Sequence, residues 1–176
     1  SRLVSSGSAG PLGLALSKRQ ASNLRAIVRT QGGTALLDRC GSGKTRTGLA
    51  LLYALATGLV RGGGTPVADT DGPVALVVAP KAVLETNWEI MLRKPLGSRE
   101  TVLQGRVRTM SFGKARNEDL QVWFEANAPA VVVVDEAQLA GGVIWEKILE
   151  ARHGKCSTVV IAMSGTLHMA GLQKFF

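Results

Sequence analysis

The feature that most constrains the fold of this chain is an alternation of short apolar runs with longer segments of helical pattern. Five runs are apolar enough to form buried strands, and they cover residues 34–38, 74–80, 106–110, 130–137 and 157–166. Strands that are separated by helices pair in parallel, because the chain must cross over between them. The sequence therefore predicts an α/β fold in three layers, with a mostly parallel central sheet.

The segments between these runs carry apolar residues at helical spacing. We expect helices at residues 17–30, 44–60, 82–94, 112–127 and 142–154, and a loop at residues 61–73. Right-handed crossovers would place these helices on both faces of the sheet.

The composition limits the class of protein. With 176 residues, of which 45% are hydrophobic, the chain suits one domain with a buried core. Its longest apolar runs fall far short of the roughly 20 residues that span a bilayer. The opening SRLVSSGSAGPLGLAL also lacks the charged head and apolar core of a secretory signal. We therefore expect an intracellular protein without a membrane partner, located in the nucleus if the cell is eukaryotic and otherwise in the cytoplasm.

Both ends of the chain indicate a piece of a longer polypeptide. Residues 1–15 are rich in Ser, Gly and Ala, and we expect them to form a flexible leader. The chain starts without Met and ends on GLQKFF, an apolar segment of helical pattern. The domain itself is expected to cover residues 16–176.

The net charge favours a polyanionic partner. The chain carries a formal charge of +8 and has an isoelectric point near 10.1, as is common among proteins that bind nucleic acid. No single basic run dominates, so a generally basic surface is the alternative interpretation.

A glycine-rich stretch, DRCGSGKT, follows the first predicted strand and opens a helix. Phosphate-cradling loops usually read G-x-x-x-x-G-K-[ST], and here Asp38 stands in the position of the first Gly. Gly41 and Gly43 allow a positive φ and a close approach of the backbone to an anion. The N–H groups from Gly41 through Ser42 to Thr45 would then point at the phosphates of ATP, at the amino end of a helix.

Two side chains of this stretch are suited to binding a nucleoside triphosphate. Lys44 would neutralise phosphate oxygens, and the Thr45 hydroxyl would bind Mg²⁺. Arg46 comes next and faces either phosphate or solvent. The alternative interpretation is a glycine-rich turn that only caps the helix.

The fourth predicted strand ends on two carboxylates, Asp135 and Glu136. Acidic groups at the end of a buried strand are costly unless they are used. We expect Asp135 to hold Mg²⁺, directly or through water, and Glu136 to orient and deprotonate the water that attacks the γ-phosphate. The alternative is a polar strand end in open solvent.

Together these segments resemble the ordered motifs of superfamily 2 helicases and translocases. The most similar group is the Snf-type chromatin remodelling ATPases, whose phosphate loop typically reads D-E-M-G-L-G-K-T. Five residues match in register, namely Asp38, Gly41, Gly43, Lys44 and Thr45, and three depart from the pattern, namely Arg39, Cys40 and Ser42. An Asp in the first position is therefore usual for the group.

Further segments extend the resemblance. Gln20 matches a Gln that reads the adenine edge, and VVAPKAVLETNW resembles an A-P-x-x-x-x-x-x-W motif that places Lys81 near a nucleic-acid strand. VRTMSF is similar to a weaker strand-contact motif, with Thr109 as the candidate. DEAQ matches D-E-x-[HQ], with Gln138 at its end.

The last segment, MSGTL, resembles the S/T-G-T motif that couples hydrolysis to movement. Ser164, Gly165 and Thr166 match, whereas Leu167 replaces the usual Pro.

The resemblance implies a RecA-like P-loop NTPase fold and the first of two such lobes. It implies ATP and Mg²⁺ as ligands, and nucleic acid as partner, with DNA favoured over RNA. A second lobe, in cis or in trans, would supply arginine fingers, which are worth about 10³–10⁵ in rate. We therefore expect this chain alone to bind ATP weakly and to hydrolyse it slowly.

Two alternatives remain. A degenerate or truncated lobe could act as a non-catalytic module that binds nucleic acid or protein. A small-molecule kinase fits less well, because DEAQ has no clear task there. Trp88, Trp123 and Trp145 lie in amphipathic segments, where we expect packing rather than stacking on bases.

Overall fold

The structure is a computed structural model that describes residues 16–29, 33–39, 41–56, 75–93, 103, 105–155 and 158–165. The predicted leader, the loop at 61–73, Cys40 and Thr166 lie outside these residues. The strands are β1 (Gly33–Leu37), β2 (Ala75–Ala79), β3 (Val107–Ser111), β4 (Val131–Asp135) and β5 (Val159–Ser164). The helices are α1 (Lys18–Arg29), α2 (Lys44–Ala56), α3 (Lys81–Val83), η2 (Leu84–Trp88), α4 (Glu89–Arg93), α5 (Phe112–Asn117), α6 (Leu120–Asn127), η3 (Ala137–Leu139) and α7 (Gly141–Lys155).

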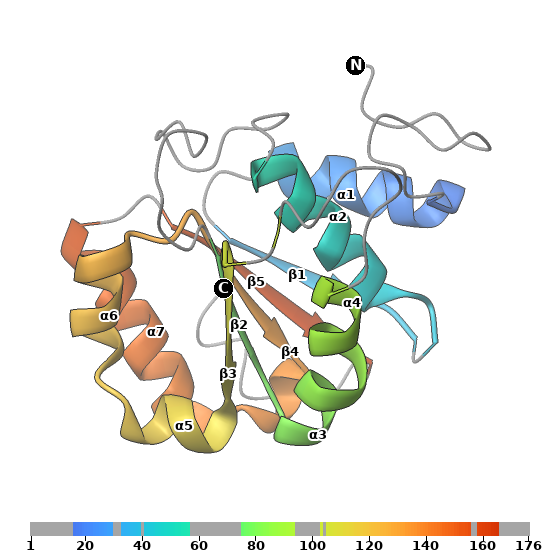
Figure 1. Cartoon of the computed structure of the whole chain (residues 1–176). Coiled ribbons are helices and arrows are strands. Elements are labelled where there is room, and N and C mark those ends of the chain that lie inside the picture. The colour runs from blue at the N-terminus through green and yellow to red at the C-terminus, as the bar shows by residue number, and fades with distance from the viewer. Residues whose placement is uncertain are drawn as a thin grey trace.

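The strands form one sheet in the order β1-β5-β4-β2-β3, and every described pair is parallel. The predicted α/β class is confirmed, and the sheet is parallel throughout its described strands rather than mostly so. The sheet lies between α1, α2 and α4 on one side and α5, α6 and α7 on the other (Figure 1). The expected helical cover on both faces is therefore confirmed.

Alternating side chains of the strands feed two separate cores. In β4, Val131 and Val133 belong to the core beneath α1 and α2, whereas Val132 and Val134 belong to the core beneath α6 and α7. Successive side chains of a strand point to opposite faces, and both faces are covered, so the run must be apolar throughout. All five β4 residues are buried, the terminal Asp135 included.

The helix expected at residues 112–127 is two helices, and this prediction was wrong in one respect. The break falls at Glu118 and Asp119, where the backbone is extended. The Asp119 side chain accepts hydrogen bonds from the N–H groups of Gln121 and Val122 at 3.0 and 3.2 Å, and so caps the start of α6. A short polar side chain that competes for backbone N–H groups ended the helix there.

The helix expected at residues 82–94 starts one residue earlier and contains a π-helical turn, η2. Residues 81–87 separate Pro80 from Trp88, one residue more than in the A-P-x-x-x-x-x-x-W pattern. A π-helical turn takes up more residues than an α-helical turn, and η2 therefore accommodates the longer interval.

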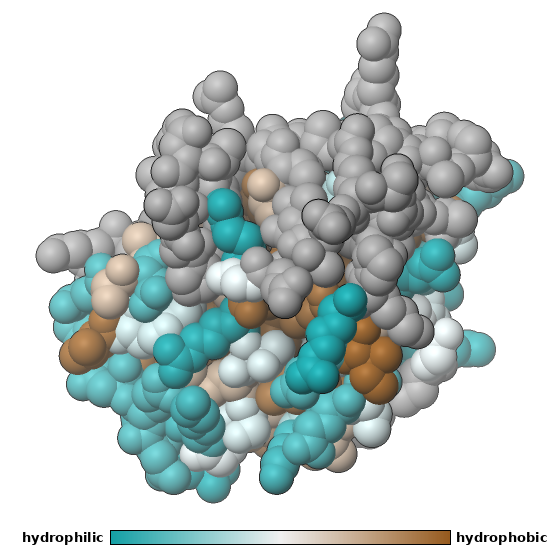
Figure 2. All heavy atoms as spheres, in the orientation of Figure 1, coloured by the Kyte–Doolittle hydropathy of each residue, from teal (hydrophilic) through white to brown (hydrophobic). Residues whose placement is uncertain are grey.

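Outside the grey atoms, hydrophilic side chains cover much of the visible face, with hydrophobic atoms emerging among them (Figure 2). Ile90 in α4 and Val122 in α6 are among the exposed hydrophobic residues. Within the described part of the chain, none of the helices combines the length and the apolar character needed to cross a membrane.

Candidate active site

The carboxyl edge of the parallel sheet gathers most of the predicted site residues. The predicted phosphate loop follows β1, Asp135 ends β4, Ser164 ends β5, and Lys81 follows β2. Because β5 lies between β1 and β4, the loop and the acidic strand end are only one strand apart. Ligands of such sheets bind at this edge.

The glycine-rich loop has the backbone conformation that its glycines were predicted to allow. Gly41 and Gly43 have φ values of +79° and +83°. The Ser42 N–H donates to the Arg39 carbonyl at 3.2 Å, and the Thr47 N–H donates to the Gly43 carbonyl at 3.0 Å, which starts α2. The loop therefore turns sharply and leads into α2. The first N–H groups of this helix have no carbonyl partner within the helix, and they lie next to the loop.

Lys44 folds back onto this loop. Its ammonium Nζ donates to the Asp38 carbonyl at 2.9 Å and to the Arg39 carbonyl at 3.2 Å, and only 8% of the residue is exposed. A buried ammonium needs such acceptors in the absence of an anion. The same group must exchange carbonyl oxygens for phosphate oxygens if it is to bind a nucleotide.

Asp38, which occupies the first position of the loop, is held by a residue of α1. Its carboxylate forms an ion pair with Arg19 and accepts the Arg39 N–H at 3.0 Å. Its own N–H donates to the Ser164 carbonyl at 3.2 Å, which prolongs the β1–β5 pairing beyond β1. Asp38 thus fixes the start of the loop relative to α1 and β5.

Gln20 lies against the loop. Its amide Nε2 donates to the Ser42 and Gly43 carbonyls, both at 3.3 Å, while its Oε1 accepts the Ser17 N–H at 2.9 Å. The Ser17 hydroxyl in turn accepts the Gln20 N–H at 3.2 Å, which makes a reciprocal cap for α1. Gln20 therefore joins the start of α1 to the phosphate loop, and its role toward adenine stays a prediction.

The Asp135 carboxylate is buried and already bonded on both oxygens. The Trp88 indole Nε1 donates to Oδ2 at 2.9 Å, and the Glu136 N–H donates to Oδ1 at 2.9 Å. Burial raises the pKa of Asp135 above its ordinary value, while these two hydrogen bonds and the Lys44 charge lower the pKa in part. Burial is the largest of these effects, and the Lys44 charge is the smallest.

Glu136 is the first of three side chains in a hydrogen-bonded row. The residue has a left-handed backbone, with φ of +51°, and its Oε2 accepts from Gln138 Nε2 at 2.6 Å. Gln138 Oε1 accepts from the Ser164 hydroxyl at 2.7 Å. The row joins the acidic strand end to the end of β5, so the structure brings together Glu136 and two residues predicted to couple hydrolysis to movement.

The remaining predicted residues are placed as follows. Thr45 is half-buried in the first turn of α2, Arg46 next to it is exposed, and Gly165 lies just beyond β5. Lys81 is exposed, and its Nζ atom lies 3.7 Å from Glu85 Oε1.

Thr109 lies inside β3, in register with Val77, rather than at the carboxyl edge. It is therefore set apart from the other site residues along the strand direction.

The residues present fit a bound triphosphate. The Ser42 hydroxyl oxygen is buried and has no hydrogen-bond partner among the described residues, and a buried polar atom without a partner is costly. A Cβ built on Gly41 meets no described atom within 4 Å, so no described side chain fills the space beside that glycine. Among the described residues no group of three or more His, Cys, Asp or Glu could hold a metal alone. A Mg²⁺ ion at Thr45 and Asp135 would need phosphate oxygens as further ligands.

Sequence reasoning missed two partners of the site. Arg19 pairs with Asp38, and Trp88 binds Asp135 from 47 positions away. The three Trp residues are buried as predicted, but packing alone did not indicate that one indole would bind the acidic strand end. A single Trp at the end of the A-P-containing segment was the available signal.

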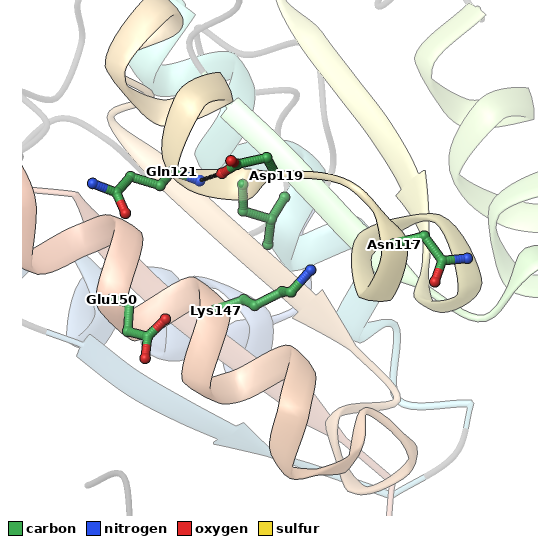
Figure 3. Close-up of a pocket in the computed structure, with 6 residues that line it drawn as sticks. Asn117, Asp119, Gln121, Lys147 and Glu150 are labelled. Atoms are coloured by element: carbon green, nitrogen blue, oxygen red, sulfur yellow. Dashed lines mark hydrogen bonds between the residues drawn. The ribbon is translucent and has the colours of Figure 1, made fainter.

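A surface pocket of about 270 Å³ lies away from the residues of the predicted site. Its lining comes from the ends of α5 and α6, the connection between them and α7, and Lys147 of α7 points toward that connection (Figure 3). The Lys147 ammonium donates to the Arg116 carbonyl at 2.6 Å, so it holds the α5–α6 connection in place. None of the predicted site residues lines this pocket.

Comparison with known proteins found no family model and no curated protein that matches the sequence. Solved structures do resemble the fold. The SWI2/SNF2 ATPase core of Sulfolobus solfataricus, solved in complex with double-stranded DNA, has a TM-score of 0.66 at 17% identity, and the match covers 94% of this chain and 35% of that one. The UvsW helicase of bacteriophage T4 has a TM-score of 0.60 at 14% identity, with coverage of 97% and 58%.

The chain thus spans about a third of the first of these proteins and somewhat over half of the second. At these identities the likeness concerns the fold, and it agrees with the fold that the sequence motifs imply. The chain therefore has an α/β fold of the RecA-like type, similar to the folds of these two proteins.

Proposed function

We propose that this chain is the ATP-binding lobe of a nucleic-acid-dependent ATPase of the Snf-like helicase or translocase type. One observation carries the proposal: the loop with its two positive-φ glycines and Lys44 follows β1, the buried Asp135 ends β4, and only β5 lies between these two parallel strands at the same sheet edge. A cationic loop opposite a buried carboxylate is the arrangement that phosphoryl transfer needs.

Each residue then has a task during ATP hydrolysis. The loop N–H groups and the Lys44 ammonium bind the β- and γ-phosphates, with the Ser42 hydroxyl as a further donor. Thr45 and Asp135 would hold Mg²⁺, which neutralises charge on the phosphate oxygens when bound.

Glu136 accepts the proton of the attacking water, and its hydrogen bond to Gln138 must break for this transfer. Gln20 keeps the loop in place from α1, whether or not it also reads adenine.

The row from Glu136 through Gln138 to Ser164 supports a coupling role. Gly165 and Thr166 follow Ser164 in the sequence, and the proposed connection to a second lobe would come further along the chain. Movement of that connection would shift the Ser164 hydroxyl, and through Gln138 it would reach the Glu136 carboxylate. A second RecA-like lobe, in cis or in trans, is part of this proposal.

Nucleic acid is the proposed partner, with DNA favoured because the Sulfolobus protein of similar fold was solved with double-stranded DNA. The net charge of +8 supports binding of a polyanion. Lys81 is exposed at the start of α3 and is the candidate phosphate contact. Thr109 is a weaker candidate, because it lies inside β3.

Calorimetric titration of the chain with MgATP tests the proposal. Lys44→Ala should abolish detectable binding, because it removes the cation at the phosphates. Lys114→Ala is the matched control, since this exposed lysine of α5 pairs with Glu118 and should leave affinity unchanged. Glu136→Gln should retain binding but stop turnover when a second lobe is supplied. Equal affinity of the Lys44 and Lys114 variants would contradict the proposal.

A second candidate is a non-catalytic module that binds nucleic acid or protein. It is favoured by the internal bonds of the site, because Lys44, Asp135 and Glu136 each have a partner within the chain. The same titration separates the two functions. Absence of heat at millimolar MgATP, together with salt-dependent binding of nucleic acid, would support the binding module.

A further inference from the structure

Trp88 is wedged between the helix that follows the phosphate loop and the acidic end of β4. The residue is fully buried, and its indole Nε1 donates to Asp135 Oδ2 at 2.9 Å. The other carboxylate oxygen accepts the Glu136 N–H at 2.9 Å. Since each oxygen has one donor from a different direction, the plane of the carboxylate is fixed, and its remaining lone pairs keep one orientation.

Gly48 provides the space in which the indole lies. A Cβ built on this residue would come within 2.9 Å of the Trp88 Cη2 atom and within 3.3 Å of the Met163 Sδ atom. Gly inside a helix is less favourable than Ala. In α2, which starts at Lys44, this cost is offset by the close approach of Trp88. The indole therefore lies against α2 and also donates to the Asp135 carboxylate.

The π-helical turn sets the position of Trp88 in its own segment. Trp88 is the last residue of η2, which runs from Leu84. A π-turn advances the following residues around the helix axis relative to an α-helix, and such turns concentrate at functional sites. The backbone irregularity thus ends on the residue that bonds to Asp135.

We propose that Trp88 is a positioning residue: its indole N–H, seated against Gly48, orients the Asp135 carboxylate to receive the Mg²⁺ that accompanies ATP. The inference rests on the proposed function and adds a residue that acts through Asp135. Partners that orient metal ligands in this way typically contribute 10–100-fold to metal affinity or activity.

The chain offers a matched control in Trp123. It is also buried, but it belongs to the core on the other face of the sheet, where it packs edge-on against Phe124 and beneath Arg108. Trp88→Phe and Trp123→Phe each shorten one buried aromatic side chain. Only the first removes a hydrogen bond to Asp135.

Calorimetry with ATP in Mg²⁺ and with ATP in EDTA tests the inference. For Trp88→Phe we expect the Mg²⁺-dependent gain in ATP affinity to fall about tenfold, with ATP affinity in EDTA unchanged. Trp123→Phe should keep the full gain. Gly48→Ala displaces the indole without changing it, and should reduce the gain in the same direction.

Three results would overturn the inference. Trp88→Phe with the full Mg²⁺-dependent gain would show that the indole N–H is dispensable. Equal losses in Mg²⁺ and in EDTA would assign Trp88 a packing role only. If the unaltered chain binds no ATP, the proposed function fails and this inference with it, whereas the first two results leave the proposed function standing.

If Trp88→Phe does not fold, the unaltered chain provides the measurement. Its three Trp residues give three indole N–H signals in a ¹⁵N spectrum, and Trp123→Phe and Trp145→Phe assign the Trp88 signal by elimination. That signal should move when Asp135 is replaced in Asp135→Asn and when Mg²⁺ is added to the ATP complex. A Trp88 signal that responds to neither change would overturn the inference.

Discussion

At the carboxyl edge of the sheet, several polar side chains are buried in surroundings that do not fully stabilise them. Lys44 has carbonyl partners, yet the Ser42 hydroxyl beside it has none among the described residues. Asp135 is bonded on both oxygens, yet burial keeps its pKa raised. Polar groups in such surroundings cost stability, and they are retained where a ligand uses them.

Gly43 and Gly41 form a natural pair for testing the loop. Both have positive φ, so Ala at either position should cost about 1–2 kcal/mol in backbone strain. At Gly43 the new Cβ would also collide with the Gln20 amide, whereas at Gly41 it meets no described atom within 4 Å. We expect Gly43→Ala to lower the free energy of unfolding in urea more than Gly41→Ala does.

The difference between these variants should come from Gln20. Shortening that side chain in Gln20→Ala/Gly43→Ala removes the collision, so the added Gly43→Ala cost should shrink toward that of Gly41→Ala. If Gly43→Ala lowers the free energy of unfolding as much in the Gln20→Ala background as in the unaltered chain, Gln20 does not cause the extra loss.

The raised pKa of Asp135 predicts a pH dependence of stability. Because the pKa is higher in the folded chain than in the unfolded chain, the folded state holds the proton more tightly, and protonation stabilises it. The wild-type chain should therefore gain stability relative to Asp135→Asn as pH falls from neutrality through the raised pKa toward 3.8. Urea unfolding of both proteins at matched pH measures this, and a constant difference would contradict it.

At the scale of elements, local chemistry decides where helices begin and end. Asp119 separates α5 from α6 because its carboxylate binds two N–H groups of α6. The neighbouring Glu118 pairs with Arg108 of β3, and its carbonyl accepts from Lys147 of α7 at 3.1 Å. The break is therefore held from two other elements, and it is more than a local interruption of helical pattern.

The cap of α6 predicts a stability effect with a close control. Asp119→Ala removes the acceptor of both N–H groups and should lower the free energy of unfolding by about 1 kcal/mol. Asp119→Asn keeps a side-chain oxygen and should lose much less. Thermal or urea unfolding of the three proteins measures both effects, and equal losses for Ala and Asn would show that the cap contributes nothing.

At the scale of the whole molecule, the excess of positive charge predicts how binding responds to salt. Each phosphate that the chain neutralises contributes about −0.9 to the slope of log K against log salt on duplex DNA. Anisotropy titration of a labelled duplex between about 50 and 200 mM salt should give a clearly negative slope. Lys81→Ala should make it shallower by about one unit. A slope near zero would contradict a nucleic-acid interface.

The order of the sheet explains why most of the predicted site residues lie at one edge. The residues of the phosphate loop and of the acidic pair are each contiguous in sequence, so their chemistry could be predicted from short stretches. Their meeting depends on β5 lying between β1 and β4, which no single stretch specifies. The same holds for Arg19 and Trp88, whose partners lie on other elements.

The sequence by itself determined the alternation of strands and helices, the burial of β2 and β4 on both faces, and the turn at Gly41 and Gly43, because these follow from local pattern and backbone preference. Only the tertiary structure decided that Lys44 folds onto its own loop, that Ser164 reaches Glu136 through Gln138, and that Trp88 bonds to Asp135. Those contacts join residues brought together by parallel crossovers, and their geometry is fixed by packing across the sheet rather than by neighbours in the chain.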